Sequence, residues 1–201
     1  MSNSGYNFKI HNDKFTAVLT GRTVKIFNKG SNDEAARFKD LKYAYRAAFN
    51  PVKNQLFVKS TEPWLAFYCL DTMSLLRKIR IKKPNNNPQD EGFCFSADGK
   101  YVLNLEFVPA IDEISSMPTC TSNLVKYDCC SFEEIERFFA NDRYHFRVIE
   151  RHNDGYLLAG REWVSNVCQM FFFDGKTIKA ISEISPDEYS SISPYAEIYY
   201  Q

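Results

Sequence analysis

Short runs of hydrophobic residues recur along the chain, and polar turn residues separate them. The runs are rich in Phe, Tyr, Val, Ile and Leu, and many of them adjoin turn signals such as ADGK, HNDG and FDGK. Runs of this kind, bounded by Gly, Asn and Asp, are typical of β-strands joined by tight turns. The pattern therefore predicts an all-β protein made of short antiparallel strands.

Two pairs of similar segments show that the strand pattern repeats. The segment AAFNPVKNQLFVKS begins at Ala47 and FCFSADGKYVLNLE begins at Phe93, with Phe49 and Phe95 aligned 46 residues apart. The segment IHNDKFTAV at 10–18 aligns with RHNDGYLLA at 151–159, an offset of 141, which is three times 47. Two independent pairs thus indicate nearly the same period, within the range that repeat architectures use.

Each repeat is expected to hold four strands. The second repeat has AYRAAF, QLFVKS, WLAFYCL and LLRKIRI, and the third has EGFCFS, YVLNLEF, NLVKYDC and FEEIERF. The first has YNFKI, FTAVLT, TVKIFN and EAARFK, and the fourth has FRVIER, GYLLAG, VCQMFFFD and TIKAISE. EAARFK and FEEIERF also fit single helical turns.

The repeats divide the chain into residues 6–39, 43–82, 91–139 and 145–184. At the C-terminal end, Ile192-Ser193-Pro194 aligns with Phe49-Asn50-Pro51. This alignment predicts a partial fifth repeat or a closing strand over residues 189–201, with Ile198 to Tyr200 as the strand.

Four short antiparallel strands in each repeat are the pattern of a propeller blade. In AAFNPVKNQLFV…LAFYCLDTMSLL and in FCFSADGKYVLN…LVKYDCCSFEEI, the chain resembles the WD-repeat-like β-propeller family. The resemblance implies an all-β, β-propeller-like array of about four four-stranded blades, as a complete or a partial propeller in one domain over 1–201. The repeats lack the Trp-Asp pair of that family, so no subfamily is assigned. Another all-β fold such as a β-sandwich is the alternative.

Loop lengths predict which end of the blades binds a partner. The turns between the first and second strands are short, whereas the opposite end has the loops 60–64, 82–91, 107–123 and 161–166. Long loops commonly carry function, and Trp and Arg are enriched among binding hot spots. The predicted binding residues are Glu62, Trp64, Phe107, Asp112, Glu113, Arg161, Glu162 and Trp163. Alternatively, each Trp begins a third strand and packs between blades.

Charge and hydropathy narrow the classes of partner. The chain has 25 basic and 25 acidic residues, so it lacks the overall positive field that attracts nucleic acid or an anionic membrane. The basic string RKIRIKK at 77–83 is explained by an edge strand protected by cations. No apolar run approaches a membrane span, and the first residues do not read as a signal peptide. We expect a cytoplasmic protein without nucleic-acid or membrane contacts.

The motifs of catalysis and metal binding are not found in the sequence. The six cysteines are not spaced as zinc ligands, no phosphate-binding glycine motif occurs, and the simplest interpretation of the cysteines is buried, reduced thiols. His-Asn-Asp at 152–154 recurs at 11–13, which indicates a turn motif and not the partner of a catalytic cysteine. We expect no catalytic residue, metal or cofactor.

Together these features favour a non-enzymatic protein–protein interaction module, a scaffold or binding protein that uses its long-loop face. The first alternative is an enzyme, a hydrolase or lyase with its site at the mouth of the propeller channel, for which Glu106, Asp112 and His145 are the candidates. A second alternative is a half-propeller that closes its ring as a homodimer through unpaired strand edges.

Overall fold

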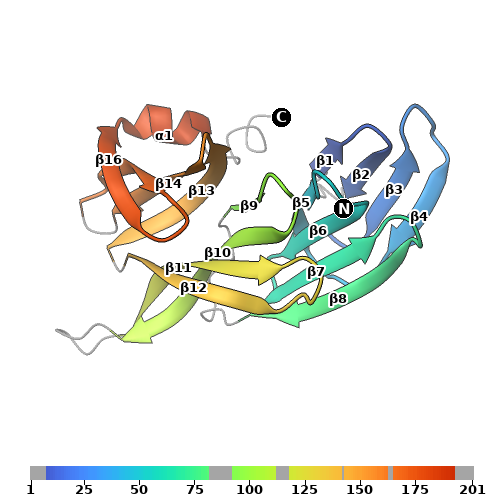
Figure 1. Ribbon diagram of the computed structural model, residues 1–201, viewed down its shortest axis with the longest axis horizontal. Coiled ribbons are helices and arrows are strands. Elements are labelled where there is room, and N and C mark those ends of the chain that lie inside the picture. The colour runs from blue at the N-terminus through green and yellow to red at the C-terminus, as the bar shows by residue number, and fades with distance from the viewer. Residues whose placement is uncertain (1–7, 82–91, 112–117, 142, 163–164, 193–201) are drawn as a thin grey trace, which may run out of the picture. The chain divides into compact units, whose positions relative to one another are not determined.

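The computed structural model describes residues 8–81, 92–111, 118–141, 143–162 and 165–192, and these form two compact units. The N-terminal unit is Met1–Ile81 and the C-terminal unit is Lys82–Gln201. Each unit contains two four-stranded antiparallel sheets in which every strand pairs with its neighbour in sequence (Figure 1). The predicted first and second repeats therefore fall in the N-terminal unit, and the third and fourth fall in the C-terminal unit.

The strands of the N-terminal unit follow the predicted segments. The first sheet contains β1 (Phe8–His11), β2 (Phe15–Leu19), β3 (Val24–Asn28) and β4 (Glu34–Phe38), and the second contains β5 (Ala44–Phe49), β6 (Gln55–Ser60), β7 (Trp64–Cys69) and β8 (Ser74–Arg80). EAARFK thus forms the strand β4, and the alternative of a helical turn is wrong there.

Alternating apolar residues build the core of the N-terminal unit. Since successive side chains of a strand point to opposite faces, every second residue of β2 and β3 is buried. The buried side chains from both sheets form one cluster that includes Leu19, Ile26, Leu56, Val58 and Tyr68. The ring of Phe38 at the end of β4 stacks on Tyr68, with centroids 4.1 Å apart. The two sheets of this unit therefore share an apolar core.

The C-terminal unit has the same arrangement with longer strands. Its first sheet contains β9 (Phe93–Phe95), β10 (Tyr101–Ile111), β11 (Pro118–Asp128) and β12 (Glu134–Asn141), and its second contains β13 (Tyr144–His152), β14 (Gly155–Glu162), β15 (Cys168–Phe173) and β16 (Ile178–Ile184). Residues 134–138 of FEEIERF lie in β12, so the alternative of a helical turn is wrong there. The core that the two sheets share includes Leu103, Leu105, Leu124, Phe146, Leu158 and Phe171.

The segment predicted as the long loop 107–123 is mostly strand. The strands β10 and β11 pair without interruption from Tyr101↔Asp128 to Ile111↔Pro118, so the prediction of a loop is wrong for 107–111 and 118–123. Residues 112–117 lie outside the described part of the chain. The short β9 pairs with β10 only at 102–104, so Pro109 lies where β10 has lost one of its neighbours. Proline is tolerated at such an edge, although in a sequence it reads as a loop signal.

A helix follows the last strand where the sequence suggested a fifth repeat. The helix α1 (Pro186–Ile192) begins after Ser185, whose Oγ accepts a hydrogen bond of 3.0 Å from the backbone N–H of Glu188. A serine cap followed by proline and two acidic residues is a strong helix start. Residues 189–192 are therefore helical, which corrects the prediction for that part of 189–201. The predicted strand at 198–200 lies outside the described residues.

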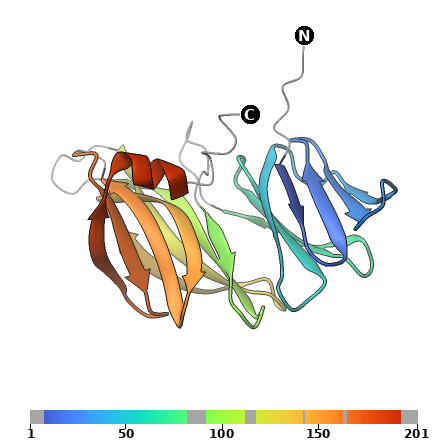
Figure 2. The ribbon, with the colours of Figure 1, turned by 90° about the horizontal axis from the view of Figure 1, so that it is seen from above.

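The helix α1 covers one face of the β13–β16 sheet, as two views show (Figures 1 and 2). Tyr189 is buried there with Val148, Ala159 and Cys168, and Ile192 packs against the same cluster. With seven residues, α1 is too short to cross a membrane, and the described chain contains no helix that could do so.

The four antiparallel sheets confirm the predicted fold class, an array of about four four-stranded blades. That the array forms one domain over 1–201 stays a prediction.

Candidate functional site

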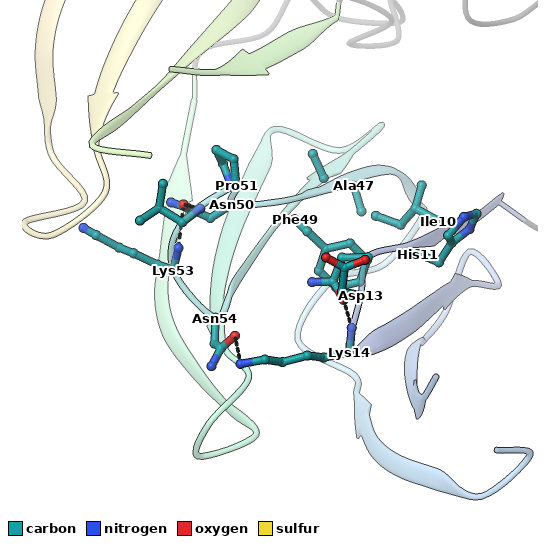
Figure 3. Close-up of a pocket in the computed structure, with 13 residues that line it drawn as sticks. Ile10, His11, Asp13, Lys14, Ala47, Phe49, Asn50, Pro51, Lys53 and Asn54 are labelled. Atoms are coloured by element: carbon teal, nitrogen blue, oxygen red, sulfur yellow. Dashed lines mark hydrogen bonds between the residues drawn. The ribbon is translucent and has the colours of Figure 1, made fainter. Parts of the chain in front are cut away.

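Each unit has a groove at the end of its sheets where short turns join a first strand to a second. In the N-terminal unit this groove has a volume of about 520 Å³ and lies between the β1–β2 turn, residues 12–14, and the β5–β6 turn, residues 50–54 (Figure 3). We call it the N-terminal groove. Its polar rim carries His11, Asp13, Lys14 and Lys53, and its apolar residues include Ile10 and Phe49.

Asparagine side chains hold both walls of the N-terminal groove in shape. The Oδ1 atom of Asn12 accepts hydrogen bonds from the backbone N–H groups of Lys14 at 2.9 Å and of Phe15 at 2.7 Å. The Oδ1 atom of Asn50 accepts bonds of 3.0 Å from the N–H groups of Val52 and Lys53. Asparagine stabilises turns in this way because its short amide reaches the backbone two and three residues ahead. The walls are therefore fixed before any ligand arrives.

A chain of polar contacts joins the two walls. Lys14 Nζ donates a hydrogen bond of 3.3 Å to Asn54 Oδ1, which Figure 3 shows as a dashed line. Asn54 Nδ2 in turn donates to Asp71 Oδ1 at 2.6 Å. The carboxylate of Asp13 is fully exposed and lies 3.7 Å from Lys29 Nζ. The ammonium group of Lys14 is thus held by Asn54, whereas the nearest carboxylate of its own turn has a separate basic partner.

The C-terminal unit has a smaller groove of about 360 Å³, which we call the C-terminal groove. Its walls are the β9–β10 turn at 96–100 and the β13–β14 turn at 153–154, and Asp174 and Gly175 of the β15–β16 turn also line it. Asp98 Oδ1 accepts hydrogen bonds from Ser96 Oγ at 2.7 Å and from the Lys100 backbone N–H at 3.1 Å. The β9–β10 turn, too, is fixed by a side chain that bonds its own backbone.

The hydrogen bonds of these turns also set the charge of the C-terminal groove. The bond from Ser96 is the main reason that the pKa of Asp98 is lowered to about 2. Backbone N–H groups of Thr177 and Lys176, each 2.8 Å from Asp174 Oδ1, lower the pKa of Asp174 to about 2 in the same way. Hydrogen bonds to the charged form favour ionisation. Both carboxylates are therefore ionised at neutral pH.

Two tyrosines contribute to the C-terminal groove. The hydroxyl of Tyr156 donates to that of Tyr101 at 3.3 Å, and Lys126 Nζ lies 4.4 Å from the centroid of the Tyr101 ring. Burial raises the pKa of the Tyr156 hydroxyl, so this group is neutral and acts as a hydrogen-bond donor.

Both grooves are walled by the two motifs that revealed the repeat. One wall of each groove is a His-Asn-Asp turn, at 11–13 or 152–154, and the other follows Phe49 or Phe95. From the sequence, these segments indicated the repeat period and tight turns, whereas binding was predicted at the opposite end of the sheets. The recurrence itself was a signal that could have found the grooves.

The predicted binding residues of the N-terminal unit have structural contacts. Trp64 is the first residue of β7, is half-buried, and packs against the core. Lys78 Nζ of the neighbouring β8 lies 4.4 Å from the centroid of the Trp64 ring, and the Arg80 guanidinium carbon lies 5.9 Å from it. Glu62 lies in the turn before β7, and its backbone N–H donates to Ser60 Oγ at 3.0 Å. These contacts fit the alternative in which Trp64 begins a strand.

In the C-terminal unit the predicted residues are dispersed. Phe107 is buried, and its ring centroid lies 4.7 Å from that of His145. Arg161 is exposed near the end of β14, and the next residue, Glu162, pairs with Arg143. A hydrogen bond from Ser165, followed in size by that from Arg143, lowers the pKa of Glu162. Asp112, Glu113 and Trp163 lie outside the described residues, and the binding role of the whole set stays a prediction.

Glu106, a candidate in the enzyme alternative, is buried in a network of hydrogen bonds. Its Oε1 atom accepts bonds from Tyr127 Oη at 2.5 Å and from Asn104 Nδ2 at 3.1 Å. Its Oε2 atom lies 3.3 Å from both terminal nitrogens of Arg137. A buried carboxyl group with this many donors is held in place by the network, because each bond compensates for lost hydration.

Within the described ranges no group of three His, Cys, Asp or Glu side chains is placed to hold a metal ion. Cys129 and Cys168 are buried free thiols, Cys69 and Cys94 are half-buried, and Cys130 is exposed. The expectation of buried thiols therefore holds for part of the set, and Cys120 lies among side chains that are not described.

Comparisons with known proteins bear on the fold. Neither a protein-family model nor a curated protein matches the chain. Among solved structures it is similar to Kuenenia stuttgartiensis hydrazine synthase, with a TM-score of 0.63, 11% identity, and coverage of 84% of this chain and 51% of that one. It is similar to the dihydro-heme d1 dehydrogenase NirN in complex with DHE, with a TM-score of 0.59, 16% identity, and coverage of 86% and 35%. It is also similar to Pyrococcus horikoshii acylaminoacyl peptidase, with a TM-score of 0.61, 12% identity, and coverage of 89% and 32%.

This chain spans between about a third and a half of the length of those three chains. At 11–16% identity the likeness shows the fold alone. The paired sheets and these neighbours together establish that the chain has a β-propeller-type fold.

Proposed function

We propose that the chain is a protein-binding module that holds a segment of another polypeptide in the turn-walled grooves of its units. The observation that carries this proposal is the pair of grooves of about 520 and 360 Å³, with walls that include the β1–β2, β5–β6 and β9–β10 turns, each fixed by its own Asn or Asp side chain. Loops held rigidly by a sheet scaffold are a common place for binding residues, and a preformed site loses little conformational entropy on binding.

The chemistry of the grooves suits a polypeptide ligand. Each groove combines apolar or aromatic side chains with charged groups at its rim, which is the composition of sites that bind mixed polar and apolar ligands. The balanced net charge of the chain favours a protein over nucleic acid or an anionic membrane as the partner. A second copy of the chain, paired through strand edges, is the other protein partner that we propose.

A peptide-display screen tests this function. Random peptides are selected on the purified chain, and each selected peptide is titrated while the backbone amides are followed by NMR. We expect shifts at 12–14 and 50–54, or at 96–100 and 153–154. The matched control is Asn50→Ala, which frees the β5–β6 turn. This change should lower the affinity only for those peptides that shift the amides of 50–54.

Two results would contradict the proposal. A screen that returns no binding peptide would contradict the proposal that the chain is a peptide-binding module. Shifts confined to the opposite ends of the sheets, around residues 61–63 and 165–166, would show that the chain binds through the loops predicted from the sequence.

A second candidate is that the chain forms part of an enzyme. The observation in its favour is that the three similar solved structures are those of a synthase, a dehydrogenase and a peptidase. The test is to mix the purified chain with acylaminoacyl chromogenic substrates and, separately, with hemin as a tetrapyrrole probe. Turnover that disappears in His145→Ala, or a saturable change in the hemin absorbance spectrum, would favour this candidate over the binding module.

A further inference from the structure

We infer that the N-terminal groove binds the carboxylate of an acidic polypeptide segment, and that Lys14 is its anchor. This inference rests on the proposed binding function and specifies the chemistry of the segment. Its basis is one ammonium group, held by a hydrogen bond to the neighbouring wall, in a groove that is also lined by apolar side chains and whose turn N–H groups are already bonded.

The floor of the N-terminal groove is apolar. Ala47 is buried, and Ile10 and Phe49 are partly buried and pack against the core of the N-terminal unit. In Figure 3 these three side chains lie above Lys14, whose own side chain extends to Asn54. A ligand that lies in this groove therefore gains by presenting an aliphatic or aromatic group to the floor while its polar group faces the rim.

The contacts of Lys14 prepare it for an anion. Asp71 can only accept hydrogen bonds, so the Asn54 amide nitrogen faces Asp71 and its oxygen faces Lys14 Nζ, at 2.6 and 3.3 Å. An ammonium group has three N–H donors, and Asn54 takes one of them. The other donors are available to a ligand, and a carboxylate is the partner that forms strong charge-assisted hydrogen bonds with them.

The charges around the groove also favour an anionic ligand. Two lysines, Lys14 and Lys53, and a single carboxylate, Asp13, line it. Since the Asp13 side chain is fully exposed and pairs with Lys29, it weakens the field of Lys14 little. The local field therefore favours an anionic over a cationic ligand.

The turns distinguish a carboxylate from a phosphate. Phosphate sites in proteins usually offer several free backbone N–H groups that converge on the anion. In this groove, Asn12 takes the N–H groups of Lys14 and Phe15, and Asn50 takes those of Val52 and Lys53. A carboxylate needs fewer donors than a phosphate, and the Lys14 ammonium can supply them.

The C-terminal groove shows why this site is confined to one unit. In the alignment of the two His-Asn-Asp turns, Lys14 corresponds to Gly155 and Ile10 to Arg151. A Cβ atom at Gly155 would lie 2.4 Å from Phe172 Cζ and 2.5 Å from the Phe173 carbonyl oxygen. The C-terminal turn therefore has no room for a lysine at the equivalent position, so it cannot form the same anchor.

Three capped synthetic peptides test the inference by isothermal titration calorimetry: N-acetyl-Leu-Glu-Leu-Glu-Leu-amide and the versions with Gln or Lys in place of Glu. We expect the Glu peptide to bind about tenfold more tightly than the Gln peptide, the effect of a charge-assisted hydrogen bond. Its affinity should fall as sodium chloride is added, because salt screens an exposed charge pair.

Variants of two lysines assign the effect to a residue. Lys14→Met keeps most of the apolar stem and removes the charge, so it should lower the affinity for the Glu peptide about tenfold and leave the Gln peptide unchanged. The matched control is Lys39→Met, an exposed lysine in the loop after β4, which should change neither affinity. Lys14→Glu should reverse the preference in favour of the Lys peptide.

The outcomes separate this inference from the proposed function. Equal binding of the Glu and Gln peptides to the unaltered chain, or an undiminished affinity in Lys14→Met, would overturn the inference and leave a peptide-binding module. Binding of none of the three peptides, while peptides from the display screen bind, would overturn it in the same way. The first comparison uses the unaltered chain, so it decides the matter even if a variant fails to fold.

Discussion

The N-terminal and C-terminal grooves have walls of the same two turn motifs and rims of opposite charge. Two lysines and one aspartate line the N-terminal groove, whereas three aspartates and one arginine line the C-terminal groove. The motifs fix the position of a groove, because their Asn and Asp side chains bond the turn backbone. The residues between these fixed points decide which ligand charge each groove favours.

The His-Asn-Asp motif also forms a different turn in each of the two units. In the N-terminal unit, residues 12–14 form the turn, and the Asn12 N–H donates to the Phe15 carbonyl at 2.9 Å. In the C-terminal unit the turn is only 153–154, with Asn153 at a φ of 48°. The aromatic residues Phe172 and Phe173 lie against Gly155, and this contact leaves no room for a side chain at the end of the C-terminal turn.

The largest expected effect comes from Gly155→Val, which tests whether the close approach to Phe172 and Phe173 shapes the C-terminal turn. A Cβ at 2.5 Å from the Phe173 carbonyl oxygen forces the backbone to move, so we expect a loss of about 3 kcal/mol in the free energy of unfolding. Urea unfolding measures it. Gly175→Ala is the control: its Cβ meets no atom within 4 Å, so only the strain of a φ of +94° remains, at about 1 kcal/mol. Equal midpoints for the two variants would contradict the explanation.

Asn50→Ala should have the next largest effect, because it removes the acceptor of two backbone hydrogen bonds in a wall of the N-terminal groove. We expect a loss of about 1–2 kcal/mol in the free energy of unfolding and faster amide exchange at Val52 and Lys53. The control is Val52→Ala in the same turn. Val52 is 66% exposed, so this change should cost less than about 0.5 kcal/mol. A cost for Asn50→Ala no larger than that of the control would show that the turn holds its shape without the amide.

Acid should affect the turns of the two grooves differently. Asp98 and Asp174 have folded pKa values of about 2, below the unfolded value of about 3.9. Their stabilising contribution is therefore complete above about pH 5 and is lost as the pH falls through about 2. The equivalent bonds of the N-terminal groove come from Asn12 and Asn50, which do not titrate.

Amide exchange between pH 5 and 2, corrected for the intrinsic rate of exchange, measures this difference. We expect protection at 99–101 and 176–178 to fall more than protection at 13–15 and 52–55. The double variant Asp98→Asn with Asp174→Asn is the control, and it should remove the difference. Parallel loss of protection in both units of the unaltered chain would contradict the prediction.

The smallest effect is expected for Asp154→Asn. Asp154 lines the C-terminal groove, and its exposed side chain has no hydrogen bond or ion pair with the described residues. The change should leave the free energy of unfolding within about 0.5 kcal/mol of the original while reducing the negative charge of the groove. Chemical denaturation checks the first part. A larger loss would show that Asp154 supports its turn as Asp98 and Asp174 support theirs.

The sequence predicted the β-sheets well because period-two alternation and turn residues are local signals. It failed at 107–111 and 118–123, which were predicted as parts of a loop although they lie in paired strands that include Pro109 and Pro118. It also missed α1, although Ser185, Pro186 and Glu188 together form a recognisable helix start. The prediction of a fifth repeat followed the alignment of Ile192 with Phe49, although the local helix start was the stronger signal.

The candidate site was harder to predict, because its properties depend on contacts between distant segments. Nothing local to Lys14 indicates that Asn54, forty residues away, fixes its ammonium group. Likewise, the sequence places Trp64 at a loop but does not show that Lys78 of β8 lies over its ring. The turns themselves were recognised, and only the pairing of turns into grooves required the structure.

The helix α1 has a consequence for assembly. Sheets with an apolar face tend to stack on further sheets, and this is how repeat arrays and fibrils grow. Tyr189 and Ile192 occupy the face of the β13–β16 sheet on which another sheet would stack, while Asp187 and Glu188 face solvent. By covering this face, α1 hides apolar surface of the C-terminal unit on which another sheet could stack.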